Sequence, residues 1–289
     1  MALLGLGVFW AITTPTEVTS RILPEHVANL ENGKLLFNAG GCISCHASGP
    51  DLKDVAADAP AGGKPLKTQI GTLYPPNLTP DPETGLGNWK LNAFLAAMQQ
   101  GLHSDGSNLI PAFPYGSYQS MKFEDVADLF AYLQSLPAVK NQTPAHDVIG
   151  LAMVRRGLTF WKWMAFAQAV WKPNSAQSET WNRGAYLVNG PGHCQECHTP
   201  RNLFMALDTS RAFMGGPHPE GKGKVPSLHG LIERARYKNA ADLVLAFQNG
   251  EALGYEHIAS GGMGEVQRNL SKLPEADLQA IAEFVLSLK

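Results

Sequence analysis

Cysteine is scarce in this 289-residue chain, and its four cysteines all fall in two copies of one pentapeptide, Cys-x-x-Cys-His. The copies contain Cys42, Cys45 and His46, and Cys194, Cys197 and His198. This pattern is typical of c-type haem attachment, in which both thiols add to the haem vinyl groups and the imidazole binds iron. A zinc site and a thioredoxin-like dithiol are alternatives, but neither needs His at that position twice. No cysteine remains for a disulfide, and two covalently attached haem c groups are predicted.

Charge is also limited, because only 17% of the residues are charged and the net charge is −2 at pH 7. Binding to nucleic acid usually requires an excess of basic residues, which this chain does not have, so a nucleic-acid partner is not expected. Hydrophobic residues make up 44% of the chain, which is enough to bury cores. The length suits two domains of about 100–150 residues each.

A hydrophobic run long enough to cross a membrane is missing at the start of the chain. Residues 1–12 (MALLGLGVFWAI) are apolar and uncharged, and the first basic residue is Arg21. As a helix they rise about 18 Å, short of a hydrocarbon core of about 30 Å. Neither a basic leader nor a clear cleavage site is visible. Residues 1–20 are either part of a membrane anchor, favoured by the lack of a polar face, or an ordinary buried helix.

Landmarks around the two haem motifs recur along the chain. Gly33 precedes the first motif and Gly184 the second, while the apolar periodicity of residues 123–136 matches that of 275–288 at an offset of 152. The sequence therefore predicts an all-α fold of two tandem cytochrome c modules. In each module the first and last helices cross, and the glycine lets an aromatic side chain approach its backbone. The module boundaries are 28–140 and 181–289, after the N-terminal segment 1–20 and separated by a connection over 141–180.

Each motif is followed at a similar distance by a proline in a loop. Pro76 comes 30 residues after His46, and Pro226 comes 28 residues after His198. We expect the proline carbonyl to accept a hydrogen bond from the imidazole of the motif, which fixes the ring and raises its basicity.

The connection is rich in tryptophan and basic residues, which favours a helical segment over a plain linker. It contains Trp161, Trp163, Trp171, Arg155, Arg156, Lys162 and Lys172. One interpretation is a helix packed over the two modules. The other is a docking surface for a partner or for the membrane interface, where Trp and basic residues are common.

The sixth iron ligand decides the role of a haem. A haem with a bound sixth ligand transfers electrons, whereas an iron with an open sixth position can bind a substrate. Met263 is the candidate at the second haem, since it lies between glycines in an expected loop ahead of the last helix. Methionine sulfur in this position closes the iron and raises its potential. The alternative is that Met263 is an ordinary core methionine.

The first haem lacks such a methionine. Close to the spacing of Met263 after His198 it has Phe113, which cannot bind iron. Met121 is the next thioether and our prediction for the ligand, although at an offset of 152 it corresponds to Leu273, an expected core position. His103 on a loop, an open or water-bound iron and a further ligand remain alternatives, and Met98 falls in a helical pattern.

Several stretches of the chain resemble the cytochrome c subunits of membrane-bound periplasmic alcohol, aldehyde and gluconate dehydrogenases. They are 77–81, 85–89, 111–115 with Tyr118, and 181–187. The resemblance covers about residues 28–289 and implies His46, His198 and Met263 as iron ligands. It also implies a dehydrogenase as electron donor and quinone, a cytochrome or a terminal oxidase as acceptor. The chain departs from many such subunits in two ways. They have three haem motifs, whereas this chain has two, and they have methionine where this chain has Phe113.

The resulting hypothesis is an electron relay at the periplasmic side of the bacterial inner membrane. Covalent haem attachment requires export, and the N-terminal segment 1–20 favours membrane anchoring. The main alternative is a dihaem enzyme of the peroxidase or thiosulfate dehydrogenase type, with catalysis at the first haem. A non-catalytic assembly subunit is a third possibility.

Overall fold

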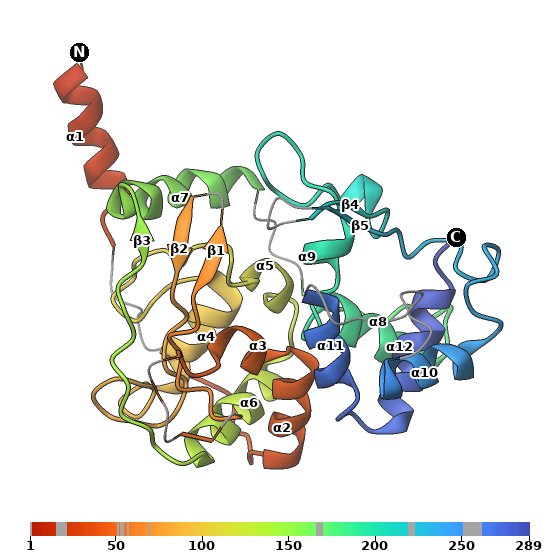
Figure 1. The fold of residues 1–289 in the computed structure, drawn as a ribbon. Coiled ribbons are helices and arrows are strands. Elements are labelled where there is room, and N and C mark those ends of the chain that lie inside the picture. The colour runs from red at the N-terminus through yellow and green to blue at the C-terminus, as the bar shows by residue number, and fades with distance from the viewer. Residues whose placement is uncertain are drawn as a thin grey trace.

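The computed structural model describes residues 2–15, 22–50, 52, 55–56, 58–68, 70–165, 170–218, 223–250 and 262–289. Over these residues the fold is mostly helical, with five short strands (Figure 1). The helices are α1 (Ala2–Ile12), α2 (Leu30–Ala39), α3 (Cys42–His46), α4 (Leu91–Gln100), α5 (Tyr115–Tyr118), α6 (Phe123–Ser135), α7 (Leu151–Ala165), α8 (Glu179–Asn189), α9 (Gln195–His198), α10 (Ala240–Asn249), α11 (Gly262–Leu270) and α12 (Glu275–Leu286), with a 3₁₀ turn at Thr209–Arg211. The strands are β1 (Leu66–Thr68), β2 (Gly71–Leu73), β3 (Asp147–Val148), β4 (Gly216–Pro217) and β5 (Lys224–Val225).

The N-terminal half, made of α2–α6 and β1–β3, is built around the crossing of α2 and α6. A Cβ placed at Gly33 would lie 2.2 Å from the Asp128 carbonyl oxygen and 2.6 Å from Tyr132 Cβ. Only glycine permits so close an approach of the two backbones. The apolar sides of α2, α4 and α6 meet in a core that includes Leu36, Phe37, Phe94, Met98, Val126, Leu129 and Leu133.

The C-terminal half, made of α8–α12 with β4 and β5, repeats this arrangement with α8 and α12. A Cβ at Gly184 would lie 1.8 Å from the Ala280 carbonyl oxygen and 3.0 Å from Phe284 Cβ. The Ser178 side chain begins α8 by accepting a hydrogen bond from the Trp181 N–H, as an N-cap does. A second core includes Leu187, Val188, Leu243, Phe247, Leu278, Ile281 and Phe284.

The two helix crossings correspond at the offset found in the sequence. Asp128 and Tyr132 face Gly33, and the residues 152 positions later, Ala280 and Phe284, face Gly184. The helices expected at 123–136 and 275–288 are α6 and α12, each ending one or two residues earlier than predicted. The predicted crossing of first and last helices, with glycine at the contact, is confirmed in both halves.

The mostly helical structure agrees with the predicted all-α class, and it also contains two small sheets that the sequence did not predict. Strands β1, β2 and β3 form an antiparallel sheet in which Leu66 pairs with Leu73 and Gly71 with Val148. Strands β4 and β5 form an antiparallel pair. Each strand has only two or three residues, which is too short for an alternating pattern to appear in the sequence.

The predicted helical connection contains α7, which lies along one edge of the molecule (Figure 1). Only Leu158 of this helix is fully buried, in a small cluster with Leu73 and Ile110. Residues 166–169 of the connection, like residues 16–20 of the N-terminal segment, lie outside the described residues. In the described part of the chain, no helix combines the length and the apolar character that crossing a bilayer requires.

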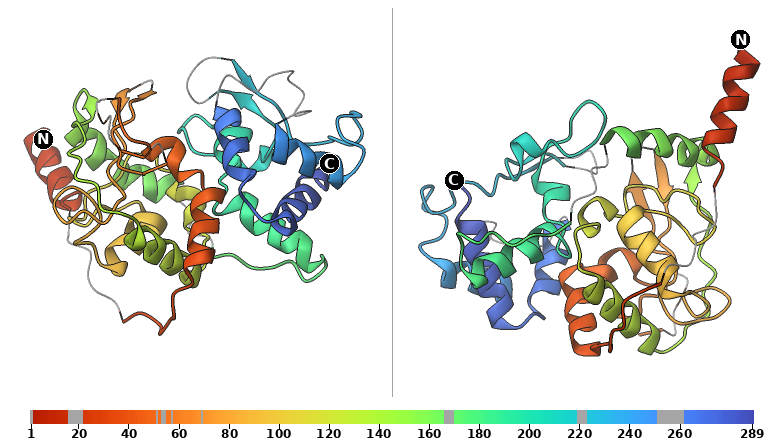
Figure 2. Two further views of the ribbon diagram at one scale, coloured as in Figure 1. Left: turned by 60° about the horizontal axis from the view of Figure 1, so that its bottom comes forward. Right: turned by 180° about the vertical axis from the view of Figure 1, so that it is seen from behind.

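Polar contacts join the two halves. The Tyr186 hydroxyl donates to the Asp125 carboxylate and accepts from the Lys122 N–H at 3.1 Å. Burial, with Asp125 as a second cause, raises the pKa of Tyr186, so the phenol stays protonated as a donor. Lys64 Nζ lies 2.8 Å from Glu265 Oε1 on α11. These contacts join α8 to α6 and α11 to the loop before β1, and α11 also packs against α2 (Figures 1 and 2).

Candidate functional site

Each Cys-x-x-Cys-His motif forms a single helical turn. Gly41, in a left-handed conformation with φ of 55°, begins α3, and α9 ends at His198. Residues three apart on a helix lie on the same face, so the turn brings its two thiols to one side. All four cysteines are described, and none forms a disulfide. The predicted arrangement of two thiols next to an imidazole is thus present twice.

The proline carbonyls lie where the sequence predicted them. His46 Nδ1 lies 2.8 Å from the Pro76 oxygen, and His198 Nδ1 lies 2.9 Å from the Pro226 oxygen. Each imidazole donates its Nδ1 proton to a carbonyl, which leaves the Nε2 lone pair available to a metal. The predicted histidine–proline hydrogen bond is confirmed in both halves.

Burial sets the protonation of these histidines. It lowers the pKa of His46 to about 4, with the Pro76 carbonyl acting in the opposite direction. Burial likewise lowers the pKa of His198, again opposed by its carbonyl partner. Both rings are therefore neutral at pH 7, which is the state that binds iron.

The thiols do not fit the two alternatives considered for the motif. Burial, and then the neighbouring cysteine, raises the pKa of Cys42 and of Cys194 to about 12. A dithiol redox centre depends on a lowered thiol pKa instead. A zinc site needs about four ligands, and the described residues contain no group of three or more His, Cys, Asp or Glu side chains placed to hold a metal.

The apolar surroundings of the motifs suit a large planar ring. Cys42 and Phe113 pack against the core of the N-terminal half, and Cys194 and Met263 pack against the core of the C-terminal half. The donor set is thus two thiols, one neutral imidazole and a hydrophobic lining on each side. This set fits a covalently attached haem.

Met263 lies in a helix and not in the expected loop. It is the second residue of α11, is half-buried and contacts the core that holds Cys194. The neighbouring Ser260 and Gly261 lie outside the described residues. The loop assignment was wrong because the sequence after Gly262 has a strongly amphipathic helical pattern, which the glycines obscured. Iron binding by Met263 stays a prediction.

The candidate sixth ligands of the first haem lie in different parts of the N-terminal half. Phe113 is half-buried and its ring packs edge-on against Tyr118. Met121 is buried in the same core, as its correspondence with buried Leu273 indicated. Met98 is also buried, within α4. His103 lies near the surface, with Nδ1 3.2 Å from Asp105 Oδ1. Met121 remains our predicted ligand, with His103 and an open iron as alternatives.

Each motif also contacts the opposite half of the molecule. The Asn269 side chain on α11 donates to Ser44 Oγ, within the first motif, at 2.8 Å. The Ser117 hydroxyl on α5 donates to Glu196, within the second motif, at 3.1 Å. Sequence reasoning missed these contacts, because nothing local in the sequence marks a pair separated by 79 or 225 residues.

His193, next to the second motif, is partly buried between the two halves. Its Nε2 lies 3.1 Å from the Gly40 carbonyl oxygen, just before the first motif, and its ring meets Tyr118 edge-on. The segments that enter the two motifs are therefore in direct contact.

Comparison with known proteins adds a second line of evidence. The sequence model of the cytochrome c family matches residues 30–137. The chain is 36% identical to a diheme cytochrome c-type protein of Cereibacter sphaeroides over 97% of this chain and 93% of that protein. It is 31% identical to the fructose dehydrogenase cytochrome subunit of Gluconobacter japonicus, over 95% of this chain and 55% of that protein. It is 33% identical to the gluconate 2-dehydrogenase cytochrome c subunit of Pantoea cypripedii, over 90% of this chain and 60% of that protein. The chain thus spans nearly all of the first relative but only part of the other two.

Proposed function

Because this chain belongs to the cytochrome c family, we propose that it is a dihaem electron carrier that passes electrons from a dehydrogenase to the respiratory chain. The observation that carries the proposal is the repeated motif, with a neutral histidine held by a proline carbonyl in each half. Relatives named as cytochrome subunits of fructose, alcohol and gluconate dehydrogenases support a dehydrogenase partner.

In this proposal the chain consists of two tandem cytochrome c modules, 28–140 and 181–289, joined by the connection 141–180. Cys42, Cys45 and His46 hold one haem, and Cys194, Cys197 and His198 hold the other, with Met121 and Met263 as the sixth ligands. When bound, each haem supplies reversible one-electron chemistry. The protein provides the axial ligands, a dry pocket and a surface for its partners.

The proposed location is the periplasmic side of the bacterial inner membrane. The covalent attachment predicted by the motifs requires export, and the apolar, uncharged α1 supports membrane association. Electrons would arrive from a periplasmic dehydrogenase subunit and leave to quinone, a cytochrome or a terminal oxidase.

One observation favours a second candidate function. The resemblance to the dehydrogenase subunits implies a methionine where this chain has Phe113, which cannot bind iron. An open first haem would fit a dihaem peroxidase or thiosulfate dehydrogenase. Against this alternative, Phe113 and the neighbouring Tyr118 give that side of the first motif an aromatic character.

The protein is expected to carry two haems. The intact mass after denaturation should exceed that of the polypeptide by two haem masses. Cys45→Ala and Cys197→Ala should each weaken attachment at one haem and leave the other in place, because the two motifs lie in separate cores. A mass equal to that of the bare chain would disprove the proposal.

Turnover measurements distinguish an electron carrier from a dihaem enzyme. Purified holoprotein should be reduced rapidly by the catalytic subunits of a fructose dehydrogenase, the partner of one relative. It should show no substantial turnover with hydrogen peroxide or thiosulfate. Rapid turnover of either substrate would move the assignment to the dihaem enzymes.

A further inference from the structure

Exposed apolar side chains gather along one edge of the molecule. Helix α7 runs along this edge and α1 rises from it, away from the body (Figures 1 and 2). The loop after α9 reaches the same edge, because Trp161 Nε1 of α7 donates to the Phe204 carbonyl at 2.7 Å. We call this surface the α7 face, defined by the exposed side chains of Met153, Trp163, Met164, Leu203, Phe204 and Met205.

The apolar exposure of this face is unusually high. Trp163 is 85% exposed and Leu203 is 99% exposed, and neither contributes to a core. Met153 and Met164 lie eleven residues apart, or about three helical turns, and so project from the same side of α7. Exposed apolar side chains of this size, gathered on two segments that meet, mark an interaction site.

Helix α1 is attached to this face by its C-terminal end. Arg156 Nη1 donates to the Trp10 carbonyl and to Thr13 Oγ1, both at 3.2 Å. The Arg156 guanidinium lies 3.7 Å from the centre of the Trp10 ring, and Phe9 stacks on Phe160 at 5.8 Å. An uncharged helix with exposed Val8 and Ile12 therefore leaves the body at the α7 face.

The segment that contains α7 carries charge of one sign. Residues 148–178 contain no Asp or Glu and four basic residues. Lys162 is not available to a ligand, because its Nζ donates to the carbonyls of Gln100 and Gly101. Arg156 is held by Trp10 and Thr13. Arg155 and the exposed Lys172 remain, and they favour an anionic surface.

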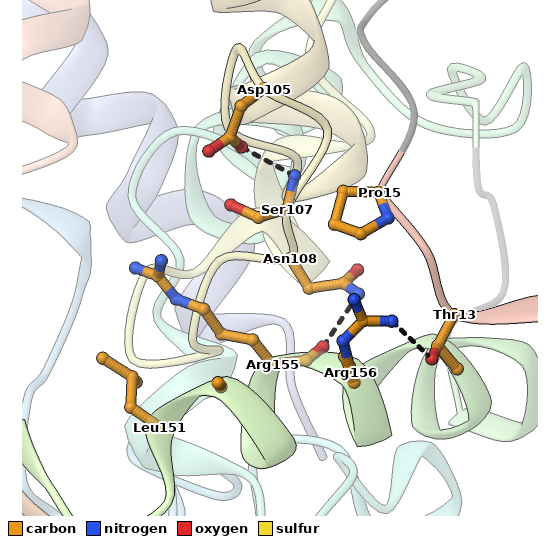
Figure 3. Close-up of a pocket in the computed structure, with 9 residues that line it drawn as sticks. Thr13, Pro15, Asp105, Ser107, Asn108, Leu151, Arg155 and Arg156 are labelled. Carbon is orange, nitrogen blue, oxygen red and sulfur yellow. Dashed lines mark hydrogen bonds between the residues drawn. The ribbon is translucent and has the colours of Figure 1, made fainter. Parts of the chain in front are cut away.

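A pocket of about 260 Å³ lies at the junction of α1 and α7 (Figure 3). Arg155 and Arg156 reach it from α7, and Ser107 lines it from the loop after α4. Among the described residues, the buried Ser107 Oγ and Arg155 Nε have no hydrogen-bond partner. Asp105 also lines the pocket, but its carboxylate accepts from the Ser107 N–H and contacts His103. A phosphate oxygen would supply the missing acceptor for both groups.

We propose that the α7 face is a lipid-docking surface that lies in the interface of a bilayer containing anionic phospholipid. Its Trp, Leu, Phe and Met side chains enter the headgroup region, as in interfacial amphipathic helices, and the pocket at Arg155 binds a headgroup phosphate. The proposal rests on the membrane location proposed above and specifies which surface meets the lipid. It does not depend on the carrier role.

Vesicle flotation of the full holoprotein tests this surface. The double variant Trp163→Ser/Leu203→Ser should bind vesicles of phosphatidylcholine and phosphatidylglycerol about tenfold more weakly than the wild type, since two exposed apolar side chains no longer insert. The matched control Ile232→Ser/Leu245→Ser removes two exposed apolar side chains outside this face and should bind as the wild type does. Arg155→Gln should weaken binding to these vesicles about fivefold, since the pocket then lacks its charged donor to the headgroup phosphate.

Unchanged flotation of the Trp163→Ser/Leu203→Ser variant would overturn the proposal. That result is expected if α1 alone holds the protein on the vesicle. Failure of the wild type to float would overturn it as well. Loss of binding to a dehydrogenase, with flotation intact, would identify the face as a protein interface and also contradict it. Haem reduction by ascorbate, measured on the same samples, should be equal in all variants. Failure of a wild type that floats to accept electrons from a dehydrogenase would count against the carrier role alone.

Discussion

Gly184→Ala is expected to unfold the C-terminal half or to destabilise it by about 3 kcal/mol, at the upper end of overpacking effects. The added methyl group would lie 1.8 Å from the Ala280 carbonyl oxygen, which is backbone and cannot turn aside as a side chain can. Helices α8 and α12 would have to separate, and the packing of Leu187 and Leu278 between them would be lost. Urea unfolding followed by circular dichroism measures the change.

The matched control is Gly157→Ala within α7. A Cβ at Gly157 meets nothing within 4 Å, so this substitution should stabilise α7 slightly, by up to about 1 kcal/mol from helix propensity. Gly33→Ala should resemble Gly184→Ala, because a Cβ there lies 2.2 Å from the Asp128 carbonyl oxygen. Wild-type stability in both Gly33→Ala and Gly184→Ala would show that the helices do not cross as closely as described.

The features that the sequence predicted are those with short-range or repeated signals. The Cys-x-x-Cys-His motifs are local, and the apolar periodicity of α6 and α12 reports their buried faces directly. The histidine–proline bonds followed from the similar spacing of Pro76 and Pro226 after their motifs. Duplication helped here, since each landmark in one half supported its counterpart in the other.

The features that the sequence missed depend on how distant segments meet. The Tyr186–Asp125 bond joins residues 61 positions apart, and His193 meets Gly40 across 153 positions. An interface between two halves leaves no periodic pattern, because its residues come singly from several loops and helices. Met263 was assigned to a loop for a different reason: glycine normally weakens a helix, but packing against the core outweighs the propensity of Gly262 and Gly264.

The two methionines give the sharpest test of the iron ligands. Met263→Leu should lower the potential of the second haem by on the order of 0.1 V, within the range of about 0.8 V that axial ligands span, and leave the first haem nearly unchanged. Thioether ligation raises the potential, and leucine of similar size removes only the sulfur. Redox titration followed by visible absorption measures both haems in one experiment.

Met121→Leu is the counterpart at the first haem and should affect that haem alone. If Met121 binds the iron, its replacement should lower that potential and open the reduced iron to carbon monoxide, which the wild type should bind poorly. Met121 is buried, and a swap of similar volume costs less than about 1.5 kcal/mol, so the fold should survive. A Met121→Leu protein with unchanged potentials would show that Met121 only packs the core. In that case, ready binding of carbon monoxide by the wild type would favour an open first iron, and a bis-histidine spectrum would point to His103.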